Sequence, residues 1–398
     1  MASPDPVEIG NENTVAMTRR RLILRDTLTF LSLTSITLVL FLVTLVLFRS
    51  FESHREELGR RWSDRGRASL NQGRPEQAIE SFRTALAYAP SQRSYQLLLA
   101  QALAEAGHSE EAFNYFATLW DSEPGSGIIN LQLARLAAAR NKPKDAANFY
   151  RASIYGTWEG DGAVRRRAVR MEFVRYLLQQ GDTSAARAEL LVVEGNADTD
   201  ASLDLEIGNL FHRAGDIAEA LEAYQKAGDS DPKDPAPFAA AGRLAYSVGR
   251  IATAQRLLQR AVRAAESAGK RDDPASRDLP ELLRQSDRIL QIFPSPQLSS
   301  NERAARLLAL RALAQKRVEA CTTAQHGLSP QLQQINARWS SSLKNDTRAA
   351  LMQDSTLQDE FLQLIFETEV AADQSCGPAS GDDALLVQVS RFPKAVDQ

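Results

Sequence analysis

The sequence predicts an all-α protein, with one N-terminal transmembrane helix, an α-solenoid of about six helix pairs and a C-terminal helical cap. Three observations support this prediction. Ala, Leu, Arg and Gln recur throughout and lose little rotamer freedom in a helix, while aromatic residues make up only 7% of the chain. An uncharged apolar run lies near the N-terminus. A 34-residue period runs through the middle of the 398 residues.

The composition argues against several classes of function. The formal net charge of −3 gives no reason to expect nucleic-acid binding. The four histidines are scattered singly and the two cysteines form no C-x-x-C pair, so metal-ligand spacing is missing and no cofactor is expected. Phosphate-binding, dinucleotide-binding and hydrolase motifs are missing as well, which predicts that the chain is not an enzyme.

The apolar run over residues 27–48 predicts a transmembrane anchor. Its 22 residues carry no charge: 15 are Leu, Val, Ile or Phe, and seven are Ser or Thr, whose hydroxyls can bond back to helix carbonyls. At about 1.5 Å per residue, the run forms roughly 33 Å of helix, enough to cross a hydrocarbon core. Residues 1–26, which include Pro4, Pro6 and Gly10, are expected to be a disordered tail, and residues 49–58 a juxtamembrane helix.

Two other interpretations of this run are weaker. A cleaved signal peptide has a shorter apolar region and a small-x-small cleavage site, which the sequence from Phe48 to Glu52 lacks. A buried helix of a soluble domain is rarely apolar on all sides over such a length. Arginines flank both ends almost equally, but the cluster before the run is tighter, which favours a cytoplasmic N-terminus. We therefore expect a single-pass inner-membrane protein whose bulk is periplasmic or otherwise extracytoplasmic.

Six windows of 34 residues share one pattern. They begin at residues 59, 93 and 127 and, after a short insertion, at 167, 201 and 235. Position 8 is small in all but one window, position 20 is always alanine, and position 24 is aromatic or leucine. Small residues at positions 8 and 20 allow two helices to approach closely, and position 24 fills the space beside them. The residue at position 15 is expected to adopt the left-handed conformation that ends the first helix. These residues are Gly73, Gly107, Asn141, Gly181, Gly215 and Gly249.

This pattern resembles the tetratricopeptide repeat (TPR). The family consensus also has tryptophan at position 4, present here as Trp62, and proline at position 32, present in three windows. Trp158 stands in place of that proline in the third window. The resemblance implies repeats 1–3 over residues 59–160 and repeats 4–6 over residues 167–268. The irregular segment 156–165 between them is expected to bend or offset the stack.

Beyond residue 268 the period is lost, and residues 275–398 are expected to form a helical cap on the last repeat, as solenoid ends require. Helical stretches are predicted over 278–293, 301–320 with Asn301 as N-cap, 330–343 and 347–371, while 385–389 fits either a helix or a short strand. Cys321 and Cys376 are interpreted as a disulfide, which suits an oxidising compartment. The alternative is two buried free thiols.

The resemblance also implies where a partner would bind. In TPR proteins the first helices of the pairs line a concave face, into which positions 2, 5, 6, 9, 12 and 13 point. Four arginines and two amides at position 9 form a ladder of hydrogen-bond donors that suits carboxylates or backbone carbonyls. The candidate groove residues are Arg67, Gln101, Arg135, Arg175, Asn209 and Arg243 at position 9, with His212 and Tyr246 at position 12. The alternative is that these arginines are ordinary solvated residues, as is the cluster at residues 165–170.

The sequence therefore predicts a non-catalytic, membrane-tethered scaffold or adaptor that holds a segment of a partner protein in its concave groove. The chain resembles the membrane-anchored TPR proteins of the bacterial envelope, which implies a role in envelope assembly or secretion. Two other classes of function stay open. One is an enzyme whose site lies unrecognised in residues 275–398, and the other is a self-assembling structural protein that forms homo-oligomers.

Overall fold

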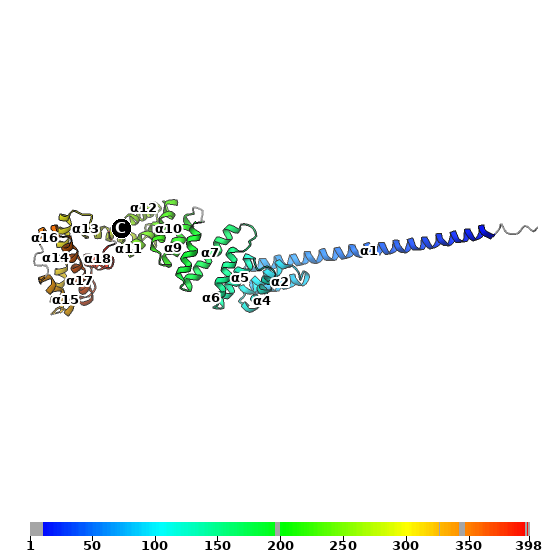
Figure 1. The fold of residues 1–398 in the computed structure, drawn as a ribbon, viewed down its shortest axis with the longest axis horizontal. Helices are drawn as coiled ribbons and strands as arrows, with labels where there is room; N and C mark the ends of the chain where they lie inside the picture. The colour runs from blue at the N-terminus through cyan, green and yellow to red at the C-terminus, as the bar shows by residue number, and fades with distance from the viewer. Residues whose placement is uncertain (1–10, 196–199, 326, 342–346, 395, 397–398) are drawn as a thin grey trace, which may run out of the picture. The chain divides into compact units, whose positions relative to one another are not determined.

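The structure is a computed structural model that describes residues 11–195, 200–325, 327–341, 347–394 and 396. Over these residues it is helical, with one isolated β-bridge and no longer strand, which confirms the predicted all-α class (Figure 1). The chain divides into two compact units, residues 1–169 and 170–398. The helices are α1 (Asn11–Asn71), α2 (Pro75–Tyr88), α3 (Arg93–Glu105), α4 (Ser109–Ser122), α5 (Gly127–Ala139), α6 (Pro143–Tyr155), α7 (Gly162–Gln179), α8 (Thr183–Gly195), α9 (Ala201–Arg213), α10 (Ile217–Ser230), α11 (Pro235–Ser247), α12 (Ile251–Ser267), α13 (Leu279–Ile292), α14 (Ser300–Gln325), α15 (Pro330–Ser341), α16 (Arg348–Gln353), α17 (Ser355–Cys376) and α18 (Gly381–Val389).

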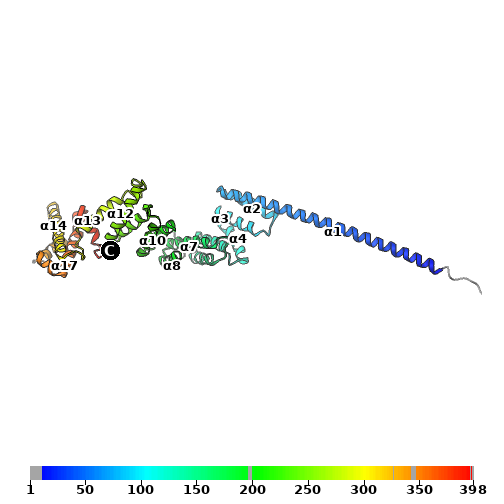
Figure 2. The ribbon, with the colours of Figure 1, turned by 90° about the horizontal axis from the view of Figure 1, so that it is seen from above.

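Helix α1 carries the apolar run and continues without a break into the first repeat, where it packs against α2 (Figures 1 and 2). The run is long and apolar enough to cross a membrane, and its side chains are exposed rather than packed against the protein. Its hydroxyls bond back to the helix as expected: Thr34 and Thr37 each donate to the carbonyl four residues earlier at 2.8 Å.

The predicted disordered tail over residues 1–26 differs from the structure, because residues 11–26 belong to α1. Residues 1–10 lie outside the described residues. The prediction relied on Pro4, Pro6 and Gly10, and all three precede the helix. After Gly10 there is no proline or glycine until Gly59, so nothing in the local sequence stops the helix.

Each predicted repeat is a pair of helices. In the first unit these pairs are the end of α1 with α2, α3 with α4, and α5 with α6. In the second unit α9 pairs with α10 and α11 with α12. Helix α7 precedes α8, and Arg170 of α7 donates to the Glu189 carboxylate of α8 at 2.9 Å. Pro75 and Pro143 stand at the start of α2 and α6, where the missing N–H costs little.

The turn inside every pair has the predicted left-handed residue. Gly73, Gly107, Gly181, Gly215 and Gly249 have φ between 66° and 83°, and Asn141 has φ 55°. The amide of the following residue then donates to a carbonyl five positions earlier, as in the bond from the Asp216 amide to the Phe211 carbonyl at 2.9 Å. Such a bond satisfies one of the carbonyls that the end of a helix leaves open.

The small residue at position 8 faces the large residue at position 24 of the same repeat. A Cβ added to Gly208 would lie 2.5 Å from the ring of Tyr224, which is 1% exposed, and a Cβ on Gly66 would lie 2.5 Å from Phe82. All six alanines at position 20 are fully buried. The pattern read from the sequence is therefore the packing contact that closes the helix pairs of the first and fifth repeats.

The C-terminal region caps the last repeat from within the second unit. Helix α13 packs against α12, and the amide of Ala252 donates to the carbonyl of Val396 at 3.1 Å. Phe392 lies against Gly249, since its Cβ would be only 2.4 Å from a Cβ added there. The chain's own end thus covers the turn of the sixth helix pair.

Two helices in this region, α14 and α17, start differently from the predictions. Ser299, not Asn301, caps α14: its hydroxyl accepts from the amide of Glu302 at 3.3 Å, and the Glu302 carboxylate accepts from the amide of Ser299 at 3.4 Å, which is a capping box. The single helix predicted over 347–371 is two, because the carboxylate of Asp354 accepts from the amides of Thr356 and Leu357 and starts α17 anew. Residues 385–389, left open between helix and strand, belong to α18.

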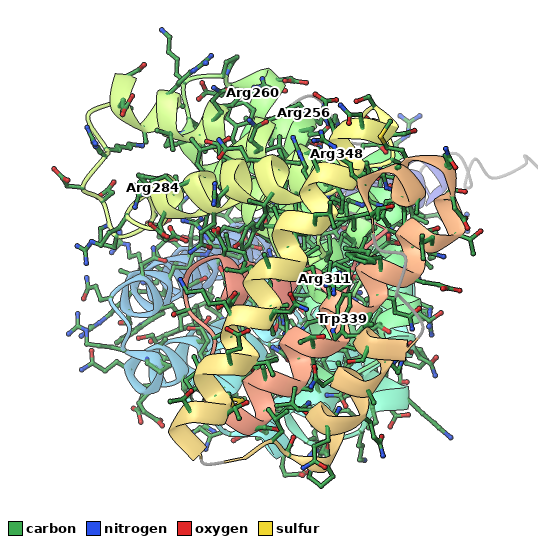
Figure 3. The ribbon with its side chains drawn as sticks, turned by 90° about the vertical axis from the view of Figure 1, so that its left-hand side faces the viewer. Arg256, Arg260, Arg284, Arg311, Trp339 and Arg348 are labelled. Atoms are coloured by element: carbon green, nitrogen blue, oxygen red, sulfur yellow. A yellow bond between two sulfur atoms is a disulfide. The ribbon has the colours of Figure 1, made fainter. Side chains whose placement is uncertain are left out.

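The core of the C-terminal region lies between α14, α15 and α17. Trp339 of α15 packs edge-to-face on Phe361 of α17 with ring centroids 5.1 Å apart, and its indole N–H donates to the hydroxyl of Thr368 at 3.1 Å. The guanidinium of Arg311 lies 5.0 Å from the Trp339 ring, as Figure 3 shows for these two labelled residues. Cys321 of α14 and Cys376 of α17 are joined by a disulfide, with their Cα atoms 5.4 Å apart.

Candidate functional site

The three position-9 residues of the first unit lie in different surroundings. Arg67 is exposed and forms an ion pair with Asp64 of the preceding turn at 3.6 Å. Arg135 of α5 is also exposed. Gln101 of α3 is half-buried and lines a hollow on the surface of this unit.

In the second unit, the position-9 residues bond to neighbouring helices. Arg175 pairs with Glu206 of α9, and the amide oxygen of Asn209 accepts from the hydroxyl of Tyr224 at 2.9 Å. Arg243 holds Asp278 in a two-pronged ion pair, with its Nε 2.9 Å from Oδ2, and this hydrogen bond lowers the pKa of Asp278. Each carboxylate belongs to the next helix pair or to the cap, so these arginines join elements of the fold.

The two position-12 residues differ in exposure. His212 is exposed on α9. Tyr246 is only 8% exposed, and its hydroxyl lies 2.5 Å from the amide oxygen of Gln285 and 3.0 Å from that of Gln388. Tyr246 and Arg243 thus connect the last repeat to the C-terminal cap. In the last of the six repeats, the predicted groove residues therefore bond to the protein itself.

The hollow beside Gln101 has a volume of about 620 Å³ and lies within the first unit. One wall is α3, through positions 2, 5 and 9 of the second repeat, Ser94, Leu97 and Gln101. The opposite wall is the start of α5, with Ile128 and Ile129. Its end is formed by Thr157, Trp158 and Glu159 of the irregular segment after α6, and by Arg165 in the first turn of α7.

Backbone pairing fixes that end segment. The amide of Gly127 donates to the carbonyl of Thr157 at 2.8 Å, and the amide of Thr157 donates to the carbonyl of Gly125 at 2.8 Å. Trp158 donates from its indole to the carbonyl of Ser153 at 3.0 Å and lies over Gly127, where a Cβ would be 2.3 Å from the ring. The one sequence signal for this arrangement was Trp158 standing in place of the repeat's proline.

A buried asparagine holds the rim of the hollow. Asn130 is fully buried, and its amide N–H groups donate to the carbonyls of Pro124 and Ser126 at 2.8 Å each. Its amide oxygen accepts from the indole of Trp120 at 3.1 Å. All polar atoms of this side chain that face the loop are therefore satisfied, and the turn between α4 and α5 is held in one conformation.

The hollow combines apolar walls with charged and amide groups at its edge. Leu97, Ile128 and Ile129 supply apolar surface. Arg93 pairs with Glu123 and also donates to the carbonyl of Leu119 at 3.2 Å. Arg165, interpreted from the sequence as a solvated helix start, lies 5.9 Å from the Trp158 ring and lines the same hollow. Such a surface can hold apolar side chains and bond a passing backbone.

The strongest electrostatic perturbation lies in the C-terminal region. Glu369 of α17 is fully buried, and its Oε2 is 3.2 Å from the guanidinium of Arg317 of α14. Burial, reinforced by repulsion from Asp383, raises the pKa of Glu369 to about 7. Burial also raises the pKa of Asp383. Arg317 donates as well to the carbonyl of Gly377, which follows the disulfide residue Cys376.

In the part of the chain that the structure describes, no three His, Cys, Asp or Glu side chains lie close enough together to hold a metal ion. Helix pairs that stack at a regular spacing, with a hollow lined by their first helices, define an α-solenoid. Residues 63–126 and 171–235 match the family model described as tetratricopeptide repeat. These two segments are therefore assigned to the tetratricopeptide-repeat family, as their resemblance implied.

Several solved structures are similar to the chain over about half or more of its length. The C-terminal part of a TPR repeat-containing protein from Cytophaga hutchinsonii has 13% identity and a TM-score of 0.47, over 62% of this chain and 94% of that one. YrrB, described as a TPR protein with an unusual peptide-binding site, has 14% identity and a TM-score of 0.38, over 51% and 99%. PilW, described as a type IV pilus biogenesis factor, has 15% identity and a TM-score of 0.40, over 56% and 98%. No curated protein matches the chain. The family assignment rests on the repeats themselves, since all three TM-scores are below 0.5.

Proposed function

We propose that the chain is a membrane-tethered, non-catalytic scaffold that binds an extended segment of a partner protein in the hollow of repeats 2 and 3. The fold is that of protein–protein interaction scaffolds. The observation that carries the proposal is the hollow beside Gln101, because positions 2, 5 and 9 of the second repeat line one of its walls, and the TPR resemblance implies that these positions bind partners. Leu97 and Ile128 can receive an apolar side chain of the partner, while Gln101 bonds its backbone.

Site-specific crosslinking tests this proposal. A photoreactive residue at Gln101 is expected to crosslink to one partner segment in intact cells, and the same probe at exposed Asn114, on the second helix of that repeat, is not. Adding Leu97→Glu should reduce the Gln101 adduct about tenfold, because a carboxylate would then be desolvated against the apolar wall. Leu191→Glu, at a leucine 50% exposed in the second unit, is the matched control. Equal crosslinking with and without Leu97→Glu would contradict the binding site.

Tethering by α1 is the second part of the proposal. Its apolar run has a mean hydropathy of 2.5, is not buried by the protein, and its threonines are satisfied by the helix itself. An exposed apolar surface of this length is costly in water and stable in a bilayer. The tether would confine the hollow to a membrane surface, where envelope assembly or secretion would supply the partner, with the repeats on the extracytoplasmic side.

Membrane extraction tests the tether. The full chain is expected to stay in the membrane pellet after alkaline carbonate washing, whereas a chain without residues 27–48 is expected in the soluble fraction. A reporter that is active only outside the cytoplasm, fused to Gln398, should be active if the proposed orientation holds. Release of the full chain by carbonate would rule out a spanning helix.

A further inference from the structure

A second hollow, outside the repeats, lies within residues 293–394 and has a volume of about 920 Å³. Its floor is apolar and comes from three segments that are far apart in the sequence. Phe293 follows α13, Ile335 lies on α15, and Leu362, Phe366 and Val370 lie on successive turns of α17. Figure 3 looks onto this region, where labelled Trp339 marks α15, one turn beyond Ile335.

The rim of this hollow is polar and open to solvent. Three glutamines line it, Gln331 and Gln334 on one side and Gln363 on the other, and all three are exposed. Each amide can both donate to and accept from a peptide backbone. A floor of aromatic and aliphatic side chains with a rim of amides is the composition of a peptide-binding groove.

The charges of the rim favour an acidic occupant. Three cations line the hollow, Arg303, Arg338 and Lys394, against the two carboxylates of Asp359 and Glu367. Arg303 pairs with Asp359 at 2.6 Å, and Arg338 pairs with Glu367. The Arg338 side chain is nevertheless 51% exposed, so it can bind a second carboxylate without leaving the first.

We propose that this hollow binds a short amphipathic segment of a partner protein, with apolar residues on one side and acidic residues at its flanks. The apolar residues enter between α15 and α17 onto Leu362 and Phe366. The acidic flanks bind Arg338 and Lys394, and the glutamines bond the backbone. The open rim favours such a segment over an enclosed small amphiphile, because most of a small ligand's surface must be buried for comparable affinity. The cap would then be a second docking site beside the repeats.

Peptide display on the full chain in detergent micelles tests this inference. A library of random 12-residue peptides is selected on the wild type alone, so that binding to the variants is an independent test. The expected consensus has two apolar residues three or four positions apart, flanked by Asp or Glu. The best peptide, made synthetically with a fluorophore, should bind Leu362→Arg at least about tenfold more weakly and Arg338→Glu several-fold more weakly. Arg391→Glu makes the same charge change at an exposed residue outside the hollow and should leave binding unchanged.

Each outcome is decisive. Arg338→Glu keeps the test valid if Leu362→Arg misfolds, since Arg338 lies at the surface. Enrichment of basic peptides, or of peptides that both variants bind normally, would overturn the inference. So would a site that binds only fluorescent dodecanoate and no peptide, because the occupant would then be a small amphiphile. None of these results depends on the hollow of repeats 2 and 3.

Discussion

Replacing both Cys321 and Cys376 with serine is expected to lower the free energy of unfolding of the C-terminal region by about 4 kcal/mol. The disulfide joins residues 55 apart and so closes a long loop, and that cross-link limits the conformations of the unfolded chain. It also ties the end of α14 to the end of α17, the two helices that pack on each other in this region. Native-state hydrogen exchange of the α14 and α17 amides, with and without reductant, measures the effect.

The double variant supplies the control for that measurement. Reductant should destabilise the wild type by a similar amount and leave the variant unchanged, because the variant has no disulfide to reduce. Amides of α9 and α10, in a repeat remote in sequence, should exchange as in the wild type. Two labelled thiols in unreduced, denatured protein would contradict the disulfide and the predicted effect together.

Glu369→Gln is expected to remove most of a pH dependence of stability between about pH 4.5 and pH 7. The buried environment raises the pKa of Glu369 from 4.5 in the unfolded chain to about 7. The folded state therefore binds more protons than the unfolded state in this window, and the stability of the wild type falls as pH rises through it. The full loss is about 3 kcal/mol, at 1.4 kcal/mol for each unit of pKa. Burial of Asp383 acts in the same direction.

Urea unfolding of the C-terminal region at a series of pH values measures this slope. The wild type should be more stable near pH 4.5 than near pH 8, and the Glu369→Gln curve should be nearly flat by comparison. Glu360→Gln removes an exposed carboxyl on the same helix and is expected to keep the slope of the wild type. A wild type whose stability rises with pH in this window would mean that the Arg317 ion pair outweighs burial.

Local sequence was sufficient to predict the repeats. The left-handed turns at Gly73 or Asn141, and the small residue that faces an aromatic ring, as Gly208 faces Tyr224, each involve residues of one helix pair. Such contacts recur every 34 residues, so a period in the sequence reveals them. The spanning-length helix was predictable for the same reason, because length and hydropathy are properties of a single segment.

Only the tertiary structure decided how the candidate binding residues are used. Arg243 and Tyr246 fit the groove pattern, yet they bond to Asp278, Gln285 and Gln388 in the cap, up to 142 positions away. Residues beyond the last repeat follow no period, so the sequence could not show which of them would meet the position-9 ladder.

The two hollows depend on the tertiary structure in the same way. The first needs the segment at Trp158 to turn back onto Gly127, and the second needs α15, α17 and the residues after α13 to meet. Periodicity determined the helix pairs because their contacts are local and repeated. The binding surfaces are formed by contacts that are distant and occur once, and only the folded chain brings those residues together.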